Sequence, residues 1–308
     1  MTYGKSATSA RLLKVLSVLA LVALTAVLAG CGSSSDDKSS DSGSSSTASI
    51  TGEFNQEAAD KLPQAIKDAG KITVATDASY APNEFFDEDG KTIIGTDADL
   101  AKAIGTTLGL EVTLKNATFD SIIPGLAAGK YDIALSSFTD TKEREKTVDM
   151  VTYLTAGTGF YTTSDNPTEV QGLADLCGKK VAVQKGTVQQ DDVEAQSKKC
   201  SDPIDLQVFT QQTDVDLALT SGKAQVALAD SPVALYAVKQ SDGTLKSTGK
   251  DYDSAPYGIA VSKDSGMTEA VQAAVQTLID NGTYAAILEK WGLTSGAITD
   301  SKINDGVE

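Results

Sequence analysis

Histidine is absent from the 308 residues, and only three cysteines, three methionines and one tryptophan are present. Without histidine the chain has no His-based catalytic triad, no His-ligated metal and none of the usual general bases near neutral pH. Two or three cysteines without histidine also make a weak zinc site. The sequence therefore argues against much hydrolytic and metal chemistry, and we expect no metal and no cofactor.

Basic residues are also in short supply, because 26 Lys and Arg stand against 42 Asp and Glu. A nucleic-acid partner would require a basic face, so we expect none. The hydrophobic content of 41% suits a globular body, and 308 residues are enough for two domains with sizeable cores.

The sequence contains one long apolar run, Val15–Leu28. It follows three basic residues and precedes Ala29-Gly30. This layout predicts a signal peptide over residues 1–30. The ending LAGC resembles a bacterial lipobox, which implies cleavage before Cys31 and a diacylglyceryl anchor on its thiol. The alternative is an ordinary signal peptide followed by an incidental cysteine. Cleavage would change the formal net charge from −16 to −19.

Residues 31–54 are rich in serine and contain one aromatic residue, near their end. Such a composition predicts a flexible tether between the anchor and the folded body. The two remaining cysteines, Cys177 and Cys200, would lie in an exported body, where disulfides persist. We expect them to form a structural disulfide that contributes about 3 kcal/mol in the chain-entropy model.

The body is predicted to consist of two α/β series, because short β-branched or apolar runs alternate with helical patterns. The first series comprises helix 55–69, broken at Pro63, strand 71–76, helix 97–108, strand 111–115, helix 121–128 and strand 131–135. The second comprises helix 168–176, strand 179–183, helix 188–199, strand 204–209, helix 213–221, strand 225–228 and helix 232–240. Strand 258–262 and helices 267–281 and 283–291 follow, and 294–308 is a polar tail. Segments 155–161 and 251–257 are predicted hinges.

Two stretches with similar sequence each predict a helix end, a Gly-Lys turn and a buried strand: LAAGKYDIAL at 126–135 and LTSGKAQVAL at 219–228. Polar residues follow both strands. In open α/β sheets, ligands bind outside the carboxyl ends of the strands. Two similarly wound lobes would therefore place these strand ends on the two sides of a cleft, although chance similarity over ten residues is an alternative.

Residues at strand ends suggest a site for an α-amino acid. Arg144, beside hydroxyls, suits a carboxylate because its planar fork matches two oxygens. Asp230 suits an ammonium group. The alternatives are a surface arginine beside a Ser/Thr-rich turn, and an aspartate that caps the helix after it. The other candidates are Asp77, Tyr80, Phe119, Ser136, Ser137, Thr139 and Thr187; for the aromatic pair the alternative is core packing, and for Asp77 a loop or cap role.

The chain resembles the family 3 solute-binding proteins of polar amino-acid ABC importers, which have the type II periplasmic binding-protein fold. The resemblance rests on KITVATDASYAP, FDSIIPGLAAGKYDIALSSFTDTKERE, KKVAVQKGT, VALADSPVALY, YGIAVSKD and NGTYAAILEKWG, which span most of residues 71–292 in the family's order. It implies two α/β lobes joined by a two-strand hinge with a ligand cleft between them. Lobe 1 would comprise residues 55–156 and 258–293, and lobe 2 residues 157–257.

The resemblance also implies roles for the candidates. Arg144 would bind the α-carboxylate, helped by Ser137, Thr139 and Thr187, and Asp230 would bind the α-amino group. Around the ligand side chain, Tyr80 and Phe119 would line the pocket, Asp77 would meet the tip, and Ser136 would contribute there. Two lobe-2 positions that vary with the ligand carry Gln184 and Val188. The family's Gly-aromatic-Asp signature lacks its aromatic here, at Gly95-Thr96-Asp97, and Met150 stands where Phe is common.

The function that follows is binding of glutamine or of a cationic amino acid such as arginine or lysine, with delivery to the membrane subunits of an ABC permease. We expect a non-enzymatic monomer, lipid-anchored on the outer face of the cell membrane. One rival is an enzyme of the same fold, such as a cyclohexadienyl dehydratase. Asp230 in the position of an amine partner argues against that. The other rival is a sensory amino-acid receptor.

Overall fold

The computed structural model describes residues 50–165 and 167–308. The predicted signal peptide, the predicted lipidation at Cys31 and most of the predicted tether lie outside the described residues. Within these two ranges, no helix is both long and apolar enough to cross a membrane.

Eight strands form one hydrogen-bonded sheet in the order β5-β1-β6-β11-β7-β10-β8-β9. The central pair, β7 and β11, is long and antiparallel, whereas β1 pairs in parallel with β5 and β6, and β8 with β9 and β10. The bounds are β1 Lys71–Thr76, β5 Glu111–Asn116, β6 Ile133–Ala134, β7 Val148–Thr163, β8 Lys180–Gln184, β9 Asp205–Phe209, β10 Val226–Asp230 and β11 Leu245–Ser262. A small sheet contains β2 Ser79–Tyr80, β3 Glu84–Phe86 and β4 Ile93–Ile94.

The strand order reads as a mirror image about the β11–β7 pair, so that β6 and β10 occupy equivalent positions. These are the two strands of the similar sequence stretches, and each follows a helix that ends six residues before it begins. The repeat in the sequence therefore corresponds to a repeat in the fold, and Ser136 and Asp230 lie at or just beyond equivalent strand ends.

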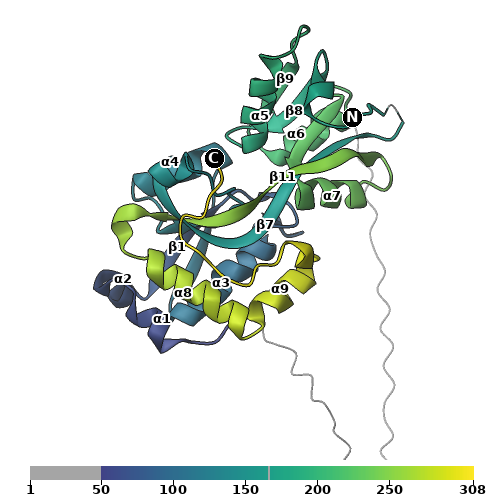
Figure 1. Ribbon diagram of the computed structural model, residues 1–308. Coiled ribbons are helices and arrows are strands. Elements are labelled where there is room, and N and C mark those ends of the chain that lie inside the picture. The colour runs from purple at the N-terminus through teal and green to yellow at the C-terminus, as the bar shows by residue number, and fades with distance from the viewer. Residues whose placement is uncertain (1–49, 166) are drawn as a thin grey trace, which may run out of the picture. The chain divides into compact units, whose positions relative to one another are not determined.

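Helices pack on the two halves of the sheet, and Figure 1 shows β7 and β11 side by side between the two groups. We call the half with β1, β5 and β6 lobe 1, and the half with β8, β9 and β10 lobe 2. The helices of lobe 1 are α1 Gln56–Asp60, α2 Gln64–Ala69, α3 Thr96–Leu108, α4 Phe119–Ala127, α8 Thr268–Asp280 and α9 Thr283–Trp291. Those of lobe 2 are α5 Val188–Ser197, α6 Gln212–Thr220 and α7 Ser231–Gln240.

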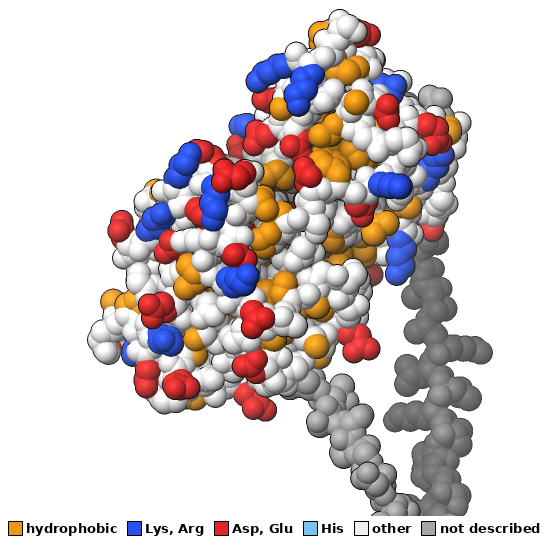
Figure 2. Space-filling view, viewed as in Figure 1, with side chains coloured by type: hydrophobic (Ala, Val, Ile, Leu, Met, Phe, Trp, Pro, Cys, Tyr) orange, Lys and Arg blue, Asp and Glu red, His pale blue; other side chains and the backbone are white. Residues whose placement is uncertain are grey.

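Each lobe has its own buried apolar clusters, one on either side of its part of the sheet. In lobe 1 a large cluster joins α3, α8 and α9 to the sheet, and a second lies under α4. In lobe 2 one cluster lies under α6 and α7 and the other under α5. On the face shown in Figure 2, acidic side chains are spread over the surface and are interspersed with lysines and arginines.

Most predicted elements are present, but helix 168–176 is wrong. Only a short 3-10 helix forms there, at Leu173–Leu176, and the residues before it are not helical. The backbone N–H of Val170 donates to Thr248 Oγ1 (3.1 Å), and that of Thr168 donates to Thr162 Oγ1 (3.2 Å). These hydrogen bonds to β11 and β7 fix the segment in an irregular conformation.

The predicted hinges, 155–161 and 251–257, are the middle parts of β7 and β11. They are paired with each other, with register shifts between Thr248 and Tyr252 and between Tyr252 and Ala255. Gly157 allows a close approach here, because a Cβ atom at this position would lie 2.8 Å from the carbonyl oxygen of Tyr252. The strand predicted over 131–135 is shorter than expected, since β6 ends at Ala134.

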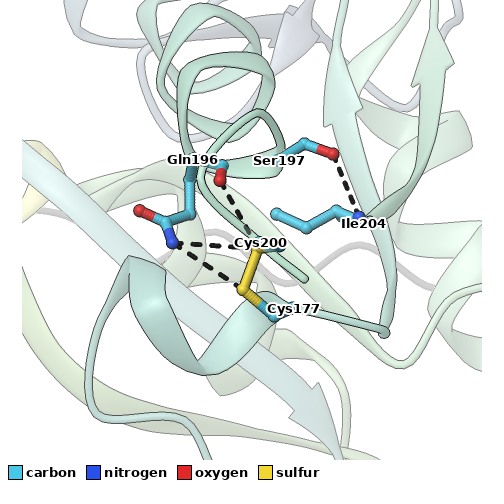
Figure 3. The surroundings of a disulfide bond; sticks show 5 residues. All are labelled: Cys177, Gln196, Ser197, Cys200 and Ile204. Atoms are coloured by element: carbon cyan, nitrogen blue, oxygen red, sulfur yellow. Dashed lines mark hydrogen bonds between the residues drawn. A yellow bond between two sulfur atoms is a disulfide. The ribbon is translucent and has the colours of Figure 1, made fainter. Parts of the chain in front are cut away.

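The predicted disulfide between Cys177 and Cys200 is present, with a Cα–Cα distance of 5.5 Å. It ties the 3-10 helix before β8 to the segment after α5, as Figure 3 shows. Ser197, near the bond, accepts a hydrogen bond from the backbone N–H of Ile204 (3.0 Å), so the turn before β9 is fixed at two points.

The C-terminal residues pack against β7 in lobe 1. The backbone N–H of Thr152 donates to the carbonyl oxygen of Lys302 (2.8 Å), and that of Asn304 donates to the carbonyl oxygen of Met150 (2.8 Å). Val307 forms an isolated parallel β-bridge with Thr141, in the segment that follows β6. The polar sequence of this segment gave no indication of these contacts.

Candidate functional site

A small cavity lies between residues that follow β6, β8 and β10. The space between these residues, counted together with the part that is open to solvent, is about 210 Å³. Its lining comprises Tyr80, Phe119, Ser137, Thr139, Arg144, Gln184, Thr187, Val188, Gln189 and Asp230.

Arg144 lies in a short 3-10 helix that leads into β7. Its Nη1 donates to the carbonyl oxygen of Thr139 (2.8 Å), and its Nη2 donates across the cleft to the carbonyl oxygen of Gly186 (3.0 Å). The guanidinium carbon is 5.3 Å from the ring centres of both Phe119 and Phe138. Burial lowers the pKa of Arg144 to about 10, so the group stays a cation at neutral pH, and the rings and carbonyls fix its plane.

Asp230, the last residue of β10, supplies the opposite charge from lobe 2. It is buried, and its Oδ1 accepts from Gln189 Nε2 (2.8 Å) while its Oδ2 accepts from the Tyr257 hydroxyl (2.6 Å). Its backbone N–H donates to the Tyr80 hydroxyl (3.0 Å). Burial raises the pKa of Asp230, and the donors from Tyr257 and Gln189 oppose that rise. The side chain makes no capping hydrogen bond to α7, so the helix-cap alternative does not describe its contacts.

Thr187 is the N-cap residue of α5 and lies on the lobe-2 wall of the cavity. Its Oγ1 accepts from the backbone N–H of Gln190 (3.3 Å) and donates to the carbonyl oxygen of Gln184 (2.7 Å). Thr139 lies opposite, in lobe 1, and is bridged to Tyr257 of β11. The two threonines therefore belong to hydrogen-bonded segments on either side of the cavity.

Asp77 follows β1 and lies behind the cavity. Its Oδ2 accepts from the backbone N–H of Phe119 (2.9 Å) and from Gln184 Nε2 of lobe 2 (2.8 Å), and its Oδ1 accepts from the Ser79 hydroxyl (2.8 Å). Burial raises the pKa of Asp77, and these donors oppose the rise. Gln184, which lines the cavity, thus connects Asp77 to it.

Two further carboxyl groups, Glu84 of β3 and Asp97 of α3, are buried behind Ser136 and Ser137. Glu84 accepts from both serine hydroxyls (2.9 and 3.2 Å), and Asp97 Oδ2 accepts from the backbone N–H of Ser137 (2.9 Å). Ser137 has a φ of +51°, in the left-handed region that non-glycine residues seldom adopt. The hydrogen bonds to the two carboxyl groups hold it there.

The structure brings seven of the nine predicted ligand residues to the cavity wall, whereas Asp77 and Ser136 lie directly behind it. Gln184 and Val188, singled out as variable positions, also line it. Sequence reasoning missed Gln189, whose only signal was its place in the first turn of a helix that begins at a predicted ligand residue. It also missed Glu84. Among the described residues, no group of three or more His, Cys, Asp or Glu side chains is arranged to hold a metal ion.

Comparison with protein families matches residues 72–294 to the bacterial extracellular solute-binding proteins, family 3. This chain belongs to that family. The predicted fold class is therefore confirmed: two α/β lobes joined by two strands, the type II periplasmic binding-protein fold.

A curated relative is the arginine-binding protein ArgT of Corynebacterium glutamicum, 35% identical over 249 residues, which are 79% of this chain and 81% of the relative. Among solved structures, an ancestral arginine-binding protein bound to arginine is 37% identical, with a TM-score of 0.68 over 72% of this chain and 98% of its own. An ancestral arginine-binding protein bound to glutamine is 36% identical, with a TM-score of 0.67 over 72% and 97%.

A further structural relative is an ancestral amino-acid-binding protein described as a precursor of cyclohexadienyl dehydratase. It is 34% identical, with a TM-score of 0.67 over 74% of this chain and 97% of its own. The fold is thus shared by binding proteins and by the lineage of an enzyme, and function has to be argued from the residues of the cavity.

Proposed function

We propose that this chain is the substrate-binding lipoprotein of an ABC importer, and that it binds glutamine or a cationic amino acid between its lobes and delivers it to the permease. The observation that carries the proposal is the presence of a cation and an anion, Arg144 and Asp230, on the wall of one small cavity. They come from different lobes, so a zwitterion that contacts both joins the lobes.

The rest of the cavity supports the same ligand class. Phe119 and Tyr80 offer apolar surface to the aliphatic part of a side chain, and Asp77 with Gln184 offers polar groups at its end. Glutamate fits less well, because the hydrogen-bond partners of the Asp77 carboxylate in the described part of the chain are Ser79, Phe119 and Gln184, and none of them is basic. The ligands named for the relatives, arginine for ArgT and arginine or glutamine for the ancestral proteins, lie within the proposed class.

Delivery to a permease requires opening and closing about β7 and β11, for which we propose the boundaries 55–156 plus 258–293 for lobe 1 and 157–257 for lobe 2. We further propose that Cys31 carries the lipid anchor and that residues 31–54 tether a monomeric body to the outer face of the membrane. In a fractionation experiment, Cys31→Ser should release the protein from the membrane fraction, whereas Ser33→Ala should not. Retention of the Cys31 variant would contradict the anchor.

A thermal-shift screen of the purified full chain against the twenty amino acids, after removal of co-purified ligand, tests the binding proposal. A ligand at one hundred times its Kd should stabilise the protein by about 2.7 kcal/mol. We expect a shift with one or a few polar amino acids. A folded protein that responds to none of them would refute the proposal and would favour a small-molecule enzyme of the dehydratase type.

A further inference from the structure

Residues 302–308, which we call the strap, lie beyond residue 294, where the match to the family ends. The strap pairs with a segment that follows β6. The backbone N–H of Val307 donates to the carbonyl oxygen of Asp140 (3.0 Å), and that of Lys142 donates to the carbonyl oxygen of Val307 (2.8 Å). The strap is therefore held to this segment by main-chain hydrogen bonds, as one strand is held to the next in a sheet.

The same segment is also tied to β11. The backbone N–H of Asp140 donates to the carbonyl oxygen of Pro256 (2.8 Å), and Thr139 forms an antiparallel bridge with Tyr257. Asp140 thus connects through its N–H to β11 and through its carbonyl oxygen to the strap. If the strap moved away, the carbonyl oxygen of Asp140 and the N–H of Lys142 would lose these partners.

This segment fixes the position of the Arg144 side chain. Arg144 Nη1 donates to the carbonyl oxygen of Thr139 (2.8 Å), and its backbone N–H donates to Oγ1 of Thr141 (3.2 Å), the residue that is bridged to the strap. Glu145, the next residue, accepts through Oε1 from the backbone N–H of Gly306 in the strap (2.9 Å). The strap therefore contacts the neighbours of Arg144 on both sides along the chain.

Gly306 fits closely against this segment. A Cβ atom at this position would lie 2.5 Å from Asp140 Oδ1, 2.7 Å from Glu145 Oε1 and 2.9 Å from the backbone carbonyl carbon of Asp140. Asp140 is wholly buried, and the third of these atoms belongs to the main chain. Because neither can give way easily, a side chain at residue 306 would push the strap away from the segment.

The end of the strap also borders the ligand site. Val307 and Glu308 line a wider hollow together with Arg144, Gly186 and Asp230. Arg144 and Asp230 also line the small cavity described above. The strap is therefore next to the opening of the site as well as behind the segment that carries Arg144.

We propose that the strap positions the group that binds the ligand's α-carboxylate: it fixes the segment of Thr139 and Arg144, and so holds the guanidinium in the plane that the carboxylate requires. A planar fork that binds two oxygens depends on its orientation for both hydrogen bonds, so a small displacement weakens both. The strap residues act through Arg144 and are positioning residues. The inference rests on the proposed function and adds to its site a segment outside the family match.

Gly306→Ala is the variant that displaces the strap. Calorimetric titration of the purified full chain, after removal of co-purified ligand, with L-arginine and with L-glutamine should show both affinities lowered by about threefold to tenfold, a difference of about 0.7–1.4 kcal/mol. Gly172→Ala is the matched control, because its φ is −178° and a Cβ atom there would meet no other atom within 4 Å. It should leave both affinities unchanged.

The same substitution in an Arg144→Lys background separates positioning from a general loss of structure. Lysine keeps the positive charge but has no planar fork to orient. Because contributions of coupled residues are not additive, Gly306→Ala should change the affinities of the Arg144→Lys protein by less than about twofold. A loss by the same factor in both backgrounds would overturn the inference, since a purely structural effect does not depend on the fork.

Asn304→Gly is a second variant, for use if Gly306→Ala does not fold. Asn304 Oδ1 accepts from the backbone N–H of Met150 (2.8 Å), and its Nδ2 donates to Asp149 Oδ1 (3.1 Å), so it joins the strap to β7. Its φ is +56°, which glycine adopts readily. It should lower both affinities in the same way. Unchanged affinities in the folded variant would overturn the inference, whereas a wild-type protein that binds neither amino acid would refute the proposed function and the inference with it.

Discussion

The two ends of the cavity differ in charge and in origin. At the end assigned to the ligand's α-carbon, Arg144 from lobe 1 and Asp230 from lobe 2 present both signs of charge. At the end assigned to the ligand side chain, Asp77 of lobe 1 lies behind the cavity wall and accepts a hydrogen bond from Gln184, which reaches across from lobe 2. In the proposed binding mode, the first end would recognise what all amino acids share, and the second would recognise what distinguishes them.

This division separates affinity from specificity. Contacts that are the same for every amino acid raise all affinities together, whereas discrimination depends on groups left unpaired by the wrong side chain. Substitutions at the first end should therefore lower the affinity for every ligand. Substitutions at the second end should change the order of the affinities. The following predictions test that difference, from the largest effect to the smallest.

Arg144→Ala should weaken every amino-acid ligand by at least about 30-fold, because removing one partner of a buried charge pair typically costs about 2–5 kcal/mol. Isothermal titration with arginine and glutamine measures the loss, and the factor should be similar for both. Lys146→Ala, which removes an exposed cation from the same 3-10 helix, is the control and should leave both affinities intact. A loss confined to one ligand would contradict the assignment of Arg144 to the shared end.

Asp77→Asn should weaken arginine by about tenfold to 100-fold, since a hydrogen bond to a charged group contributes about 1.5–3 kcal/mol. Glutamine, with a neutral amide, should change by about threefold or less. Competition between the two ligands measures the ratio directly, with the exposed Asp264→Asn as the matched control. Equal losses for arginine and glutamine would show that Asp77 does not discriminate between side chains.

Acid should weaken binding at both ends. Burial raises the pKa of Asp230 and of Asp77 above the ordinary value for aspartate, and both groups must be ionised to pair with a cationic ligand. As the pH falls from 7 toward these raised pKa values, protonation removes the charge, so the Kd for arginine should rise. In Asp77→Asn the rise should be smaller, because Asp230 alone remains to titrate. Tighter binding at acid pH would have the wrong sign for both assignments.

Strand ends could be located from sequence because each is marked by neighbouring residues in the chain. Buried runs such as KITVAT and DIAL are followed by polar residues, and the carboxyl ends of parallel strands meet at one edge of a sheet. Arg144 and Asp230 were found in this way, although nothing local shows that they line one cavity. The helix predicted over 168–176 is wrong because backbone N–H groups of this segment donate to the hydroxyls of Thr162 in β7 and Thr248 in β11. Thr248 lies 78 residues from its partner Val170, so no local pattern indicates that contact.

Glu84 could not be recognised from sequence, because a glutamate beside an acidic turn is typical of an exposed loop. Its burial depends on Ser136 and Ser137, some fifty residues further along the chain. Asp97 was noted only as part of the family's Gly-aromatic-Asp signature, and its contacts with Ser137 and Tyr153 appear only in the folded chain. Buried polar networks of this kind are assembled by tertiary structure.

Titration of the purified protein with L-arginine and with agmatine tests the assignment of the shared end most directly. Agmatine keeps the guanidinium group and the amine but lacks the α-carboxylate that Arg144 is assigned to bind. We predict binding of arginine and at least about 100-fold weaker binding of agmatine, a difference of about 2.7 kcal/mol. Equal affinity for the two would contradict a site that holds an amino acid by its carboxylate.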